Sequence, residues 1–168
     1  MDPAKFFRQV LDVTTAVVWR EELRGEGQRV VFTNGCFDVL HAGHVEYLAW
    51  ARAQGEALIV GLNADDSVRR LKGDRRPIVP FAERAKVLCA LRSVDVVVGF
   101  NEDTPEALLE RIKPDFHVKS AQYREEDLPE RAIVLRNGGE IRLAPHIEGV
   151  STTDVIATIV ARYSEPSA

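Results

Sequence analysis

The sequence has few cysteines and no long apolar run. Cys36 and Cys89 are the only two cysteines among 168 residues and form no CxxC pair, which argues against a disulfide scaffold and a cysteine-based zinc site. No apolar stretch approaches the roughly 20 residues that a membrane-spanning helix needs, and residues 1–8 lack the hydrophobic segment of a secretory leader. We therefore expect a cytoplasmic protein with two reduced thiols and no membrane contact.

The chain also lacks a large excess of charge of either sign. Its 22 basic and 26 acidic residues leave a formal net charge of −4, which argues against non-specific nucleic-acid binding. With 45% hydrophobic and 29% charged residues, the composition is that of a folded protein, and the length suits one domain. We expect an N-terminal helical arm at residues 1–27, a single domain at 28–163 and a C-terminal tail at 164–168.

The most informative stretch that is present is Thr-Asn-Gly-Cys-Phe-Asp-Val-Leu-His-Ala-Gly-His, at residues 33–44. It follows the apolar residues 30–32 and precedes a helical pattern, so it forms the bend between a strand and a helix N-terminus. Free backbone N–H groups and the positive end of a helix dipole favour phosphate there. His41 and His44 lie three residues apart with Gly43 between them, which puts two donors on one side of the helix start. The pattern predicts a phosphate site.

Two other interpretations of the histidine pair are less well supported. Histidines at this spacing could bind a metal ion, but the spacings of zinc motifs are absent from the sequence. A single histidine is most often a cap or part of the core, whereas this pair flanks a glycine in a turn. Cys36 lies inside the same turn, yet no base accompanies it in a nucleophile motif. Phosphate binding is therefore the preferred interpretation.

Short apolar runs alternate with helical patterns along the rest of the chain. Strands are predicted at residues 29–33, 57–62, 94–100, 116–119 and 140–143, and helices at 43–54, 64–71, 81–91, 105–112, 128–137 and 152–163. The alternation predicts an α/β fold with a doubly wound, Rossmann-like sheet of five parallel strands. Because ligands bind beyond the carboxyl ends of such strands, at the switch point, we expect the first turn to border the site.

Charged and hydroxyl residues follow other predicted strands and could complete this site. Five cations occupy residues 69–76, in a loop that could close over phosphates or form a solvated basic surface. Asp65 could bind Mg²⁺ or a substrate hydroxyl, or cap a helix, and Lys119 ends the fourth predicted strand. The Ser-Thr-Thr segment 151–153 follows Gly149 at a helix start, where it would bind phosphates or act as a cap. Each of these groups thus has a functional and a structural interpretation.

Taken in order along the chain, these segments resemble the nucleotidyltransferase α/β-phosphodiesterase superfamily, which includes the cytidylyltransferases. The His-x-Gly-His element at residues 41–44 is the superfamily pattern. The resemblance is greatest to the nucleotidyltransferase domain family of bacterial ADP-heptose synthases and extends over residues 28–162. It rests on an ordered set of segments at residues 33–44, 61–65, 71–77, 102–105, 112–115 and 151–153.

The resemblance implies an adenylyltransferase that transfers AMP from ATP to D-glycero-β-D-manno-heptose 1-phosphate, with Mg²⁺ held mainly by the triphosphate. It implies a homodimer, and also a separate sugar kinase, because 168 residues leave no room for one. The implied catalytic residues are His41, His44 and Lys72. The implied nucleotide contacts are Thr33, Asn34, Gly35, Cys36, Phe37, Gly43, Gly149, Ser151, Thr152 and Thr153. The implied substrate contacts are Asp38, Asp65, Arg84 and Lys119, although Arg84 could equally pair with Glu83 or Asp74.

Two departures from the family pattern leave alternatives open. Family members commonly have Gly-Gly-Asp-Tyr after the Lys119 position, whereas this chain has Ser-Ala-Gln-Tyr at 120–123, so the acceptor stays open. Glycerol-phosphate cytidylyltransferases usually carry an arginine where this chain has His146, which argues against CTP. A cytidylyltransferase acting on glycerol 3-phosphate or another small phosphate is the second interpretation. A nucleotide-binding module without catalytic activity is the third.

Overall fold

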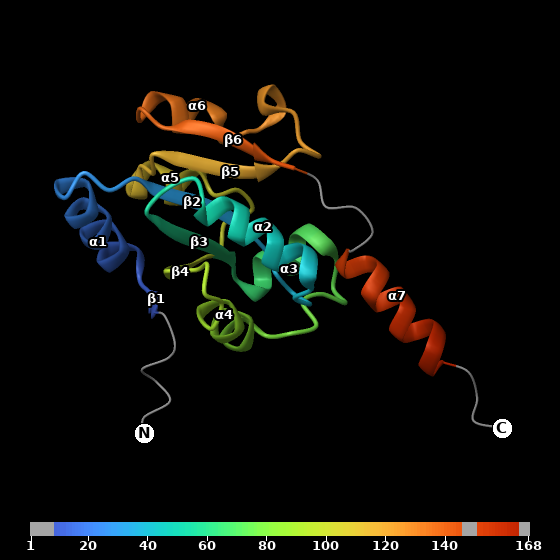
Figure 1. The fold of residues 1–168 in the computed structure, drawn as a ribbon. Coiled ribbons are helices and arrows are strands. Elements are labelled where there is room, and N and C mark those ends of the chain that lie inside the picture. The colour runs from blue at the N-terminus through green and yellow to red at the C-terminus, as the bar shows by residue number, and fades with distance from the viewer. Residues whose placement is uncertain (1–8, 146–150, 165–168) are drawn as a thin grey trace, which may run out of the picture.

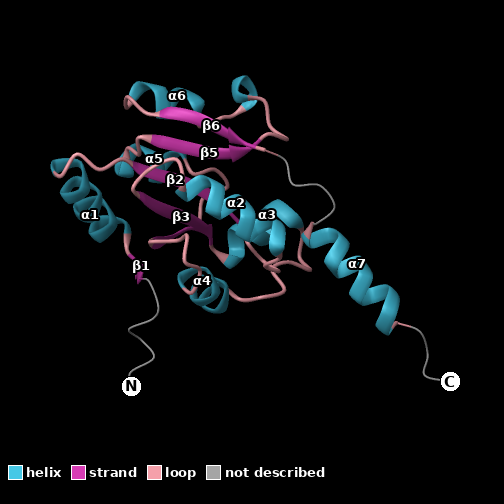
Figure 2. Cartoon of the chain, viewed as in Figure 1, coloured by secondary structure: helices cyan, strands magenta, loops and turns pink. Residues whose placement is uncertain are grey.

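Six parallel strands form one sheet with the order β1-β4-β3-β2-β5-β6. The computed structural model describes residues 9–145 and 151–164. Helices lie against both faces of the sheet (Figure 1, Figure 2). The predicted doubly wound α/β fold is therefore confirmed. The strands are β1 (Gln9–Leu11), β2 (Val30–Gly35), β3 (Ala57–Asn63), β4 (Val96–Phe100), β5 (Phe116–Ser120) and β6 (Glu140–Ala144).

Each predicted helix is present, with ends that differ from the prediction by a few residues at most. An additional helix occupies the N-terminal region, and a short 3₁₀ turn, η2 (Glu125–Asp127), precedes α6. The helices are α1 (Val13–Gly25), α2 (Ala42–Arg52), α3 (Asp65–Lys72), α4 (Phe81–Cys89), α5 (Glu106–Ile112), α6 (Arg131–Arg136) and α7 (Thr152–Tyr163).

Alternate residues of the central strands divide the core into two layers. Val31 and Leu58 pack with α2 and α4 on one face of the sheet. Val30, Phe32 and Ile59 pack with α1, α5 and α6 on the other face. Because successive side chains of a strand point to opposite faces, a continuous apolar run fills both layers. All seven residues of β3 are buried accordingly, which explains why the strand shows no alternation in sequence.

The structure differs from the sequence prediction at the N-terminus. β1 pairs with β4 and adds a sixth strand, so the prediction of five strands is wrong by this one. Three residues at a sheet edge are too few to show a hydrophobic period, which is why the pattern misses them. α1 packs on the sheet through the fully buried Ala16, so residues 9–25 are part of the domain and do not form a separate arm. Residues 1–8 and 165–168 of the predicted arm and tail lie outside the described residues.

The topological switch point of the sheet lies between β2 and β5. From β2 the chain proceeds through β3 to β4 on one side, and it later crosses to β5 and β6 on the other side. The turn that begins at the end of β2 leads into α2, so the helix N-terminus lies at the carboxyl edge of the sheet. This edge is where doubly wound sheets bind their ligands, as the sequence predicts.

Helix α7 projects away from the sheet (Figure 1). It begins at the cap residue Ser151, whose Oγ atom accepts a hydrogen bond from the Asp154 N–H group at 3.1 Å. None of its residues is buried. Within residues 9–145 and 151–164, no helix combines the length and apolar character needed to cross a membrane. The large apolar residues most exposed on α7 are Ile159, Val160 and Tyr163.

Candidate active site

The turn after β2 brings its two histidines into direct contact. His41 is the N-cap of α2 and His44 lies in the first turn of that helix, so the two rings stack with centroids 3.8 Å apart. The Phe37 ring packs edge-on against His44, with centroids 5.3 Å apart. The Nδ1 atoms of both histidines are buried, and neither has a hydrogen-bond partner in the described part of the chain. These two nitrogen atoms are therefore unsatisfied within the described part of the chain.

Burial keeps this histidine pair uncharged at neutral pH. It lowers the pKa of His44 to about 4, with a further contribution from the neighbouring His41. Burial also lowers the pKa of His41. A neutral imidazole still donates one N–H group, so the pair offers hydrogen bonds and no net positive charge. The positive charge that a triphosphate needs must come from other residues.

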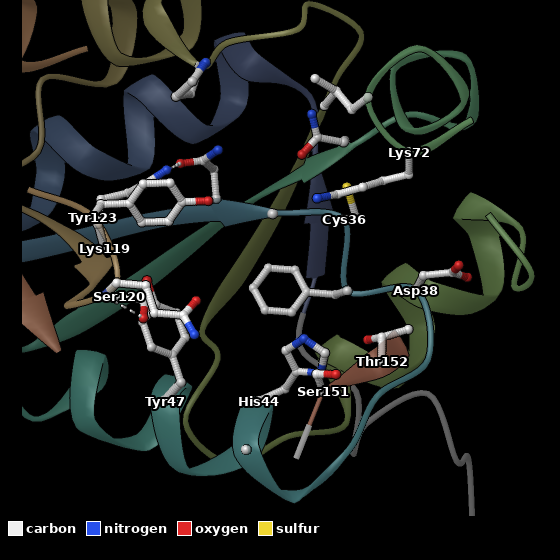
Figure 3. A pocket seen from close by; sticks show the side chains of 18 of the residues that line it. Cys36, Asp38, His44, Tyr47, Lys72, Lys119, Ser120, Tyr123, Ser151 and Thr152 are labelled. Carbon is white, nitrogen blue, oxygen red and sulfur yellow. Dashed lines mark hydrogen bonds between the residues drawn. The ribbon is translucent and has the colours of Figure 1, made fainter. Parts of the chain in front are cut away.

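The histidines face a cavity of about 670 Å³ at the carboxyl ends of β2 and β5. This volume is typical of a site for a small molecule. Figure 3 shows His44 and Thr152 on one side of the cavity, with Lys119 and Tyr123 on the other. The fold thus brings together most of the residues that the sequence predicts. Those on the cavity wall are Asn34, Gly35, Cys36, Phe37, Asp38, His41, Gly43, His44, Lys72, Lys119, Ser151, Thr152 and Thr153.

Three other predicted site residues do not line the cavity: Thr33, Asp65 and Arg84. The buried Thr33 hydroxyl group donates to the Val118 carbonyl oxygen at 3.0 Å. Asp65 Oδ1 accepts a hydrogen bond from Arg84 Nη2 at 2.7 Å. Their interactions are therefore with the protein itself, and we assign them to support of the site in place of the predicted ligand contacts. Gly149 and His146, the remaining residues of the prediction, lie outside the described residues.

Arg84 connects the first turn to β3 and α4. Its side chain is almost fully buried, and every hydrogen bond that it makes has a protein acceptor. A buried guanidinium group is stable only when its donors are satisfied in this way. The group therefore holds in place the backbone that surrounds the histidines. Its partners are the carbonyl oxygens of Val79 at 2.9 Å, Cys36 at 2.5 Å and Asn63 at 2.9 Å, together with the Asp65 carboxylate.

Asp38 attaches the loop after α3 to the same turn. Its buried carboxylate accepts hydrogen bonds from the Ile78 and Val79 N–H groups, both at 2.8 Å, and forms an ion pair with Arg76. Burial alone would raise the pKa of this carboxyl group, but the two N–H donors and Arg76 outweigh it and lower the pKa. Asp38 lines the cavity, yet its oxygen atoms are already occupied. We therefore assign it a positioning role rather than the predicted substrate contact.

Lys72 is the cation of residues 69–76 that is best placed to meet a phosphate. It lines the cavity, and no ion pair involves it among the residues that the structure describes. Figure 3 shows its side chain extending toward Cys36 at the cavity wall. Among the described residues, no carboxylate therefore neutralises the positive charge that Lys72 brings to the cavity wall. Three arginines of the same segment are paired: Arg69 with Asp66, Arg70 with Asp103 and Arg76 with Asp38.

The start of α7 reaches the cavity from the far end of the sequence. Thr152 Oγ1 donates to the carbonyl oxygen of Val39, in the first turn, at 3.3 Å. Ser151 caps the helix and also donates to the Asp154 carboxylate at 2.7 Å. Ser151 therefore acts as the helix cap, and the helix start, which has free N–H groups, borders the cavity.

Two residues around the cavity carry no sequence signal that would have identified them. Tyr47 lines it, and so does Glu130, a buried carboxylate. Glu130 pairs with Lys119 and with the buried His117. These residues belong to no motif, and they come together only because α2, β5 and the segment before α6 meet at one edge.

Metal ligands are scarce around the cavity. Within the described residues, no group of three or more His, Cys, Asp or Glu side chains could hold a metal ion. The oxygen atoms of Asp38 are occupied, and Asp65 is paired with Arg84. Because Mg²⁺ binds oxygen ligands and retains several waters, an ion that enters with a triphosphate would find its ligands mainly on the phosphates.

Residues 32–158 match the family described as cytidylyltransferase-like, a range that contains the turn, both histidines and the start of α7. The chain belongs to this family of nucleotidyltransferases. Among relatives of this cytidylyltransferase-like domain is the "Bifunctional protein HldE" of Shewanella amazonensis, 52% identical over 143 residues, which are 85% of this chain and 30% of the relative. The domain spans about 30% of the length of the curated relatives that it matches.

Solved structures share the fold of the cytidylyltransferase-like domain. The lipopolysaccharide core biosynthesis protein from Thermoplasma volcanium has a TM-score of 0.60 and 26% identity, over 72% of this chain and 100% of that chain. Pantothenate synthetase from Thermus thermophilus has a TM-score of 0.62 and 16% identity, over 88% of this chain and 67% of that chain. The second likeness concerns the fold alone. Together they agree with the Rossmann-like sheet.

Proposed function

We propose that the chain transfers AMP from ATP to D-glycero-β-D-manno-heptose 1-phosphate, giving ADP-heptose and pyrophosphate. The observation that carries this proposal is a single cavity that contains the histidine pair, Lys72, the start of α7 and Lys119. Joining two phosphate-bearing substrates requires positioning and charge stabilisation more than covalent catalysis. Similarity to proteins named bifunctional HldE supports the heptose acceptor.

In this reaction a phosphate oxygen of the acceptor attacks the α-phosphorus of ATP, which enters with Mg²⁺ as part of the substrate. A new O–P bond forms while the bond from the α-phosphorus to the bridging oxygen breaks, and pyrophosphate leaves with the electron pair. His41 and His44 donate hydrogen bonds where charge develops on that oxygen. Lys72 supplies positive charge, and the first turn of α7 binds the leaving phosphates. Backbone groups of residues 33–37 seat the nucleotide.

The reaction needs no protein nucleophile, and the cysteine in the turn is unsuited to that role. Burial raises the pKa of Cys36, although Lys72, Arg84 and Arg76 act in the opposite direction. A thiol in this state stays protonated at neutral pH and is a poor nucleophile. Direct transfer between the two substrates is therefore the mechanism that the site favours.

Pyrophosphate release over a matrix of four nucleoside triphosphates and several sugar and polyol phosphates tests the proposal. We expect the highest rate with ATP and heptose 1-phosphate. The highest rate with CTP and glycerol 3-phosphate would favour the second interpretation, which the family description also suggests. No release with any pair, in a protein that still binds nucleotide, would favour the module without catalytic activity.

We predict that ATP is preferred over CTP by at least about tenfold in kcat/KM, or about 1.4 kcal/mol. The histidines contact phosphate, which the two nucleotides share, so the preference must come from groups that hydrogen-bond the base. A pocket that pairs with one base edge leaves its polar groups unsatisfied when the other base is bound. Competition between the two nucleotides in the same assay measures the ratio. Equal or better use of CTP would contradict the adenylyl assignment.

Replacing Lys72 with methionine should lower kcat/KM for the nucleotide by about thirtyfold, or about 2 kcal/mol. The substitution removes the positive charge opposite the triphosphate and keeps most of the side-chain volume. Initial rates at varied nucleotide concentration measure the effect. Arg75→Met provides a matched control, because Arg75 belongs to the same basic segment and does not line the cavity. Unchanged kinetics in Lys72→Met would place the working cation elsewhere, with Arg76 as the next candidate.

The proposal also covers the source of the acceptor, the cellular compartment and the oligomeric state. Its acceptor must come from a sugar kinase, since the substrate is a sugar phosphate, and ATP places the reaction in the cytoplasm. We also propose a homodimer. The exposed apolar residues of α7 support it, because a second copy would remove them from water. Light scattering of the purified chain measures its mass in solution.

A further inference from the structure

A second cluster of charged side chains lies at the Lys119 end of the cavity, away from the histidines. The Glu130 Oε1 atom lies 3.1 Å from Lys119 Nζ and 3.0 Å from His117 Nε2. Lys119 also donates to Asn34 Oδ1 at 3.3 Å. The side chain of His117 is fully buried and that of Glu130 is 2% exposed, so this arrangement is part of the folded structure and not a flexible surface pair.

The second carboxylate oxygen of Glu130 is available to a ligand. Oε1 receives both protein interactions, and Oε2 has no hydrogen-bond partner on another described residue. Glu130 nevertheless lines the cavity. A carboxylate oxygen accepts about two hydrogen bonds, so Oε2 retains capacity for a donor on a bound molecule.

The charges at this end of the cavity indicate what kind of group binds there. Lys119 and Glu130 together carry no net charge, and burial lowers the pKa of His117 so that its ring adds none. The site therefore attracts a phosphate much less strongly than the Lys72 end does. A carboxylate accepts hydrogen bonds from hydroxyl groups, and an ammonium group donates to them, so the pair suits a polyhydroxylated molecule.

The rest of the cavity wall near Lys119 also suits a polyhydroxylated molecule. The Tyr123 ring lies 5.2 Å from Lys119 Nζ, and Figure 3 shows these two side chains next to each other. Ser120 and Gln122 also line this part of the cavity, where the related family has glycines and a carboxylate. Polar side chains beside an aromatic ring form a surface that binds sugar rings well.

We infer that Glu130 is a specificity-determining residue, which accepts a hydrogen bond from a hydroxyl group of the acceptor through Oε2 and holds Lys119 toward a second oxygen. The inference rests on the proposed function, and it narrows the acceptor to polyhydroxylated phosphates. An acceptor without the hydroxyl group leaves Oε2 without this hydrogen bond. Sites built to bind a hydroxyl group reject analogues that lack it for this reason.

The test compares Glu130→Gln with wild type on three acceptors at saturating ATP: heptose 1-phosphate, its monodeoxy analogues and ethyl phosphate, which has no hydroxyl group. We expect kcat/KM for heptose 1-phosphate to fall about thirtyfold, mainly through a higher KM, as for one charge-assisted hydrogen bond. Activity with ethyl phosphate and with one monodeoxy analogue, and the KM for ATP, should stay within about twofold of wild type.

Two further variants separate recognition from a structural role. Glu126→Gln removes an exposed carboxylate of the same segment, which pairs with Arg124, and should match wild type throughout. Glu130→Asp keeps the negative charge but withdraws it by one methylene, and it should also lose the preference for heptose 1-phosphate. Thermal unfolding and ATP affinity, measured by calorimetry, report whether the variants keep the fold and the nucleotide site.

Different results of this comparison would contradict the role of Glu130 and the proposed function. Equal losses of Glu130→Gln on ethyl phosphate and heptose 1-phosphate, or an unchanged preference between them, would overturn the inference. If wild type does not use heptose 1-phosphate, the proposed function fails, and the same comparison is made with the best acceptor of the matrix. A best acceptor without hydroxyl groups, or one whose use is insensitive to Glu130→Gln, would then overturn the inference as well.

Discussion

Replacing His44 with alanine should reduce turnover by about 10² to 10³, which corresponds to about 3–4 kcal/mol of transition-state stabilisation. The ring is neutral in the free enzyme, since burial lowers the pKa of His44 to about 4. Its contribution is therefore a hydrogen bond from a donor already in position, directed at the oxygen on which charge develops. Single-turnover rates of pyrophosphate formation at saturating ATP measure the loss separately from product release.

The His44→Gln variant and measurements of stability distinguish a catalytic role of His44 from a structural one. His44→Gln retains an N–H donor at a similar distance and should recover part of the activity lost in His44→Ala. Folding should be little affected in either variant, because His44 belongs to neither buried apolar cluster. Near-normal turnover in His44→Ala would show that the assigned role is wrong. A large loss of thermal stability would instead show that the stacked pair with His41 is a structural element.

Arg84→Met should lower the free energy of unfolding by about 3 kcal/mol or more. Arg84 is 1% exposed, and its guanidinium group donates to three carbonyl oxygens and the Asp65 carboxylate, so its removal leaves buried acceptors without donors. Methionine fills most of the space, and the loss therefore reports the unpaired groups and not a cavity. Urea unfolding followed by far-UV circular dichroism measures the change.

An exposed arginine provides the matched control for this prediction. Arg136 forms an ion pair with Glu110, and 63% of its side chain is exposed. Arg136→Met should change stability by less than about 1 kcal/mol, because solvent screens surface pairs. If Arg84→Met were as stable as wild type, we would conclude that the buried hydrogen bonds of Arg84 do not hold the turn against β3 and α4. If it were as stable as wild type but had a much higher KM for the acceptor, the predicted substrate contact of Arg84 would be supported.

The turn that carries the two histidines could be predicted because it is continuous in sequence. Residues 33–44 pass from β2 into α2, and the path of a strand–turn–helix unit depends mainly on neighbouring residues. The sheet could be predicted for a related reason. Strands such as β3 are buried on both faces and are long enough to form a continuous apolar run in the sequence. The three residues of β1 are too few to form such a run.

The cluster of Lys119 and Glu130 could not be predicted in the same way. Glu130 stands between a proline and an arginine, beside no motif, and its carboxylate reaches Lys119 only because β5 and the segment before α6 meet at the edge of the sheet. The sequence identifies Lys119 as a cation at a strand end, which suggests a phosphate contact. The buried partner reverses that expectation, since a neutralised lysine suits a hydroxyl group better.

By itself the sequence determined the order of β2 to β6 and of the helices that follow these strands, the strand–turn–helix unit at residues 33–44 and the positions of the two histidines in it, because each depends on residues within a dozen positions of one another. Only the tertiary structure decided which positively charged side chains remain available to a ligand. Arg84, Arg76 and Lys72 are chemically alike in the sequence, yet two of them are paired with Asp65 and Asp38 while Lys72 faces the cavity. Such ion pairs join residues that are distant along the chain. They are therefore determined by the packing of the elements and cannot be deduced from the local sequence pattern.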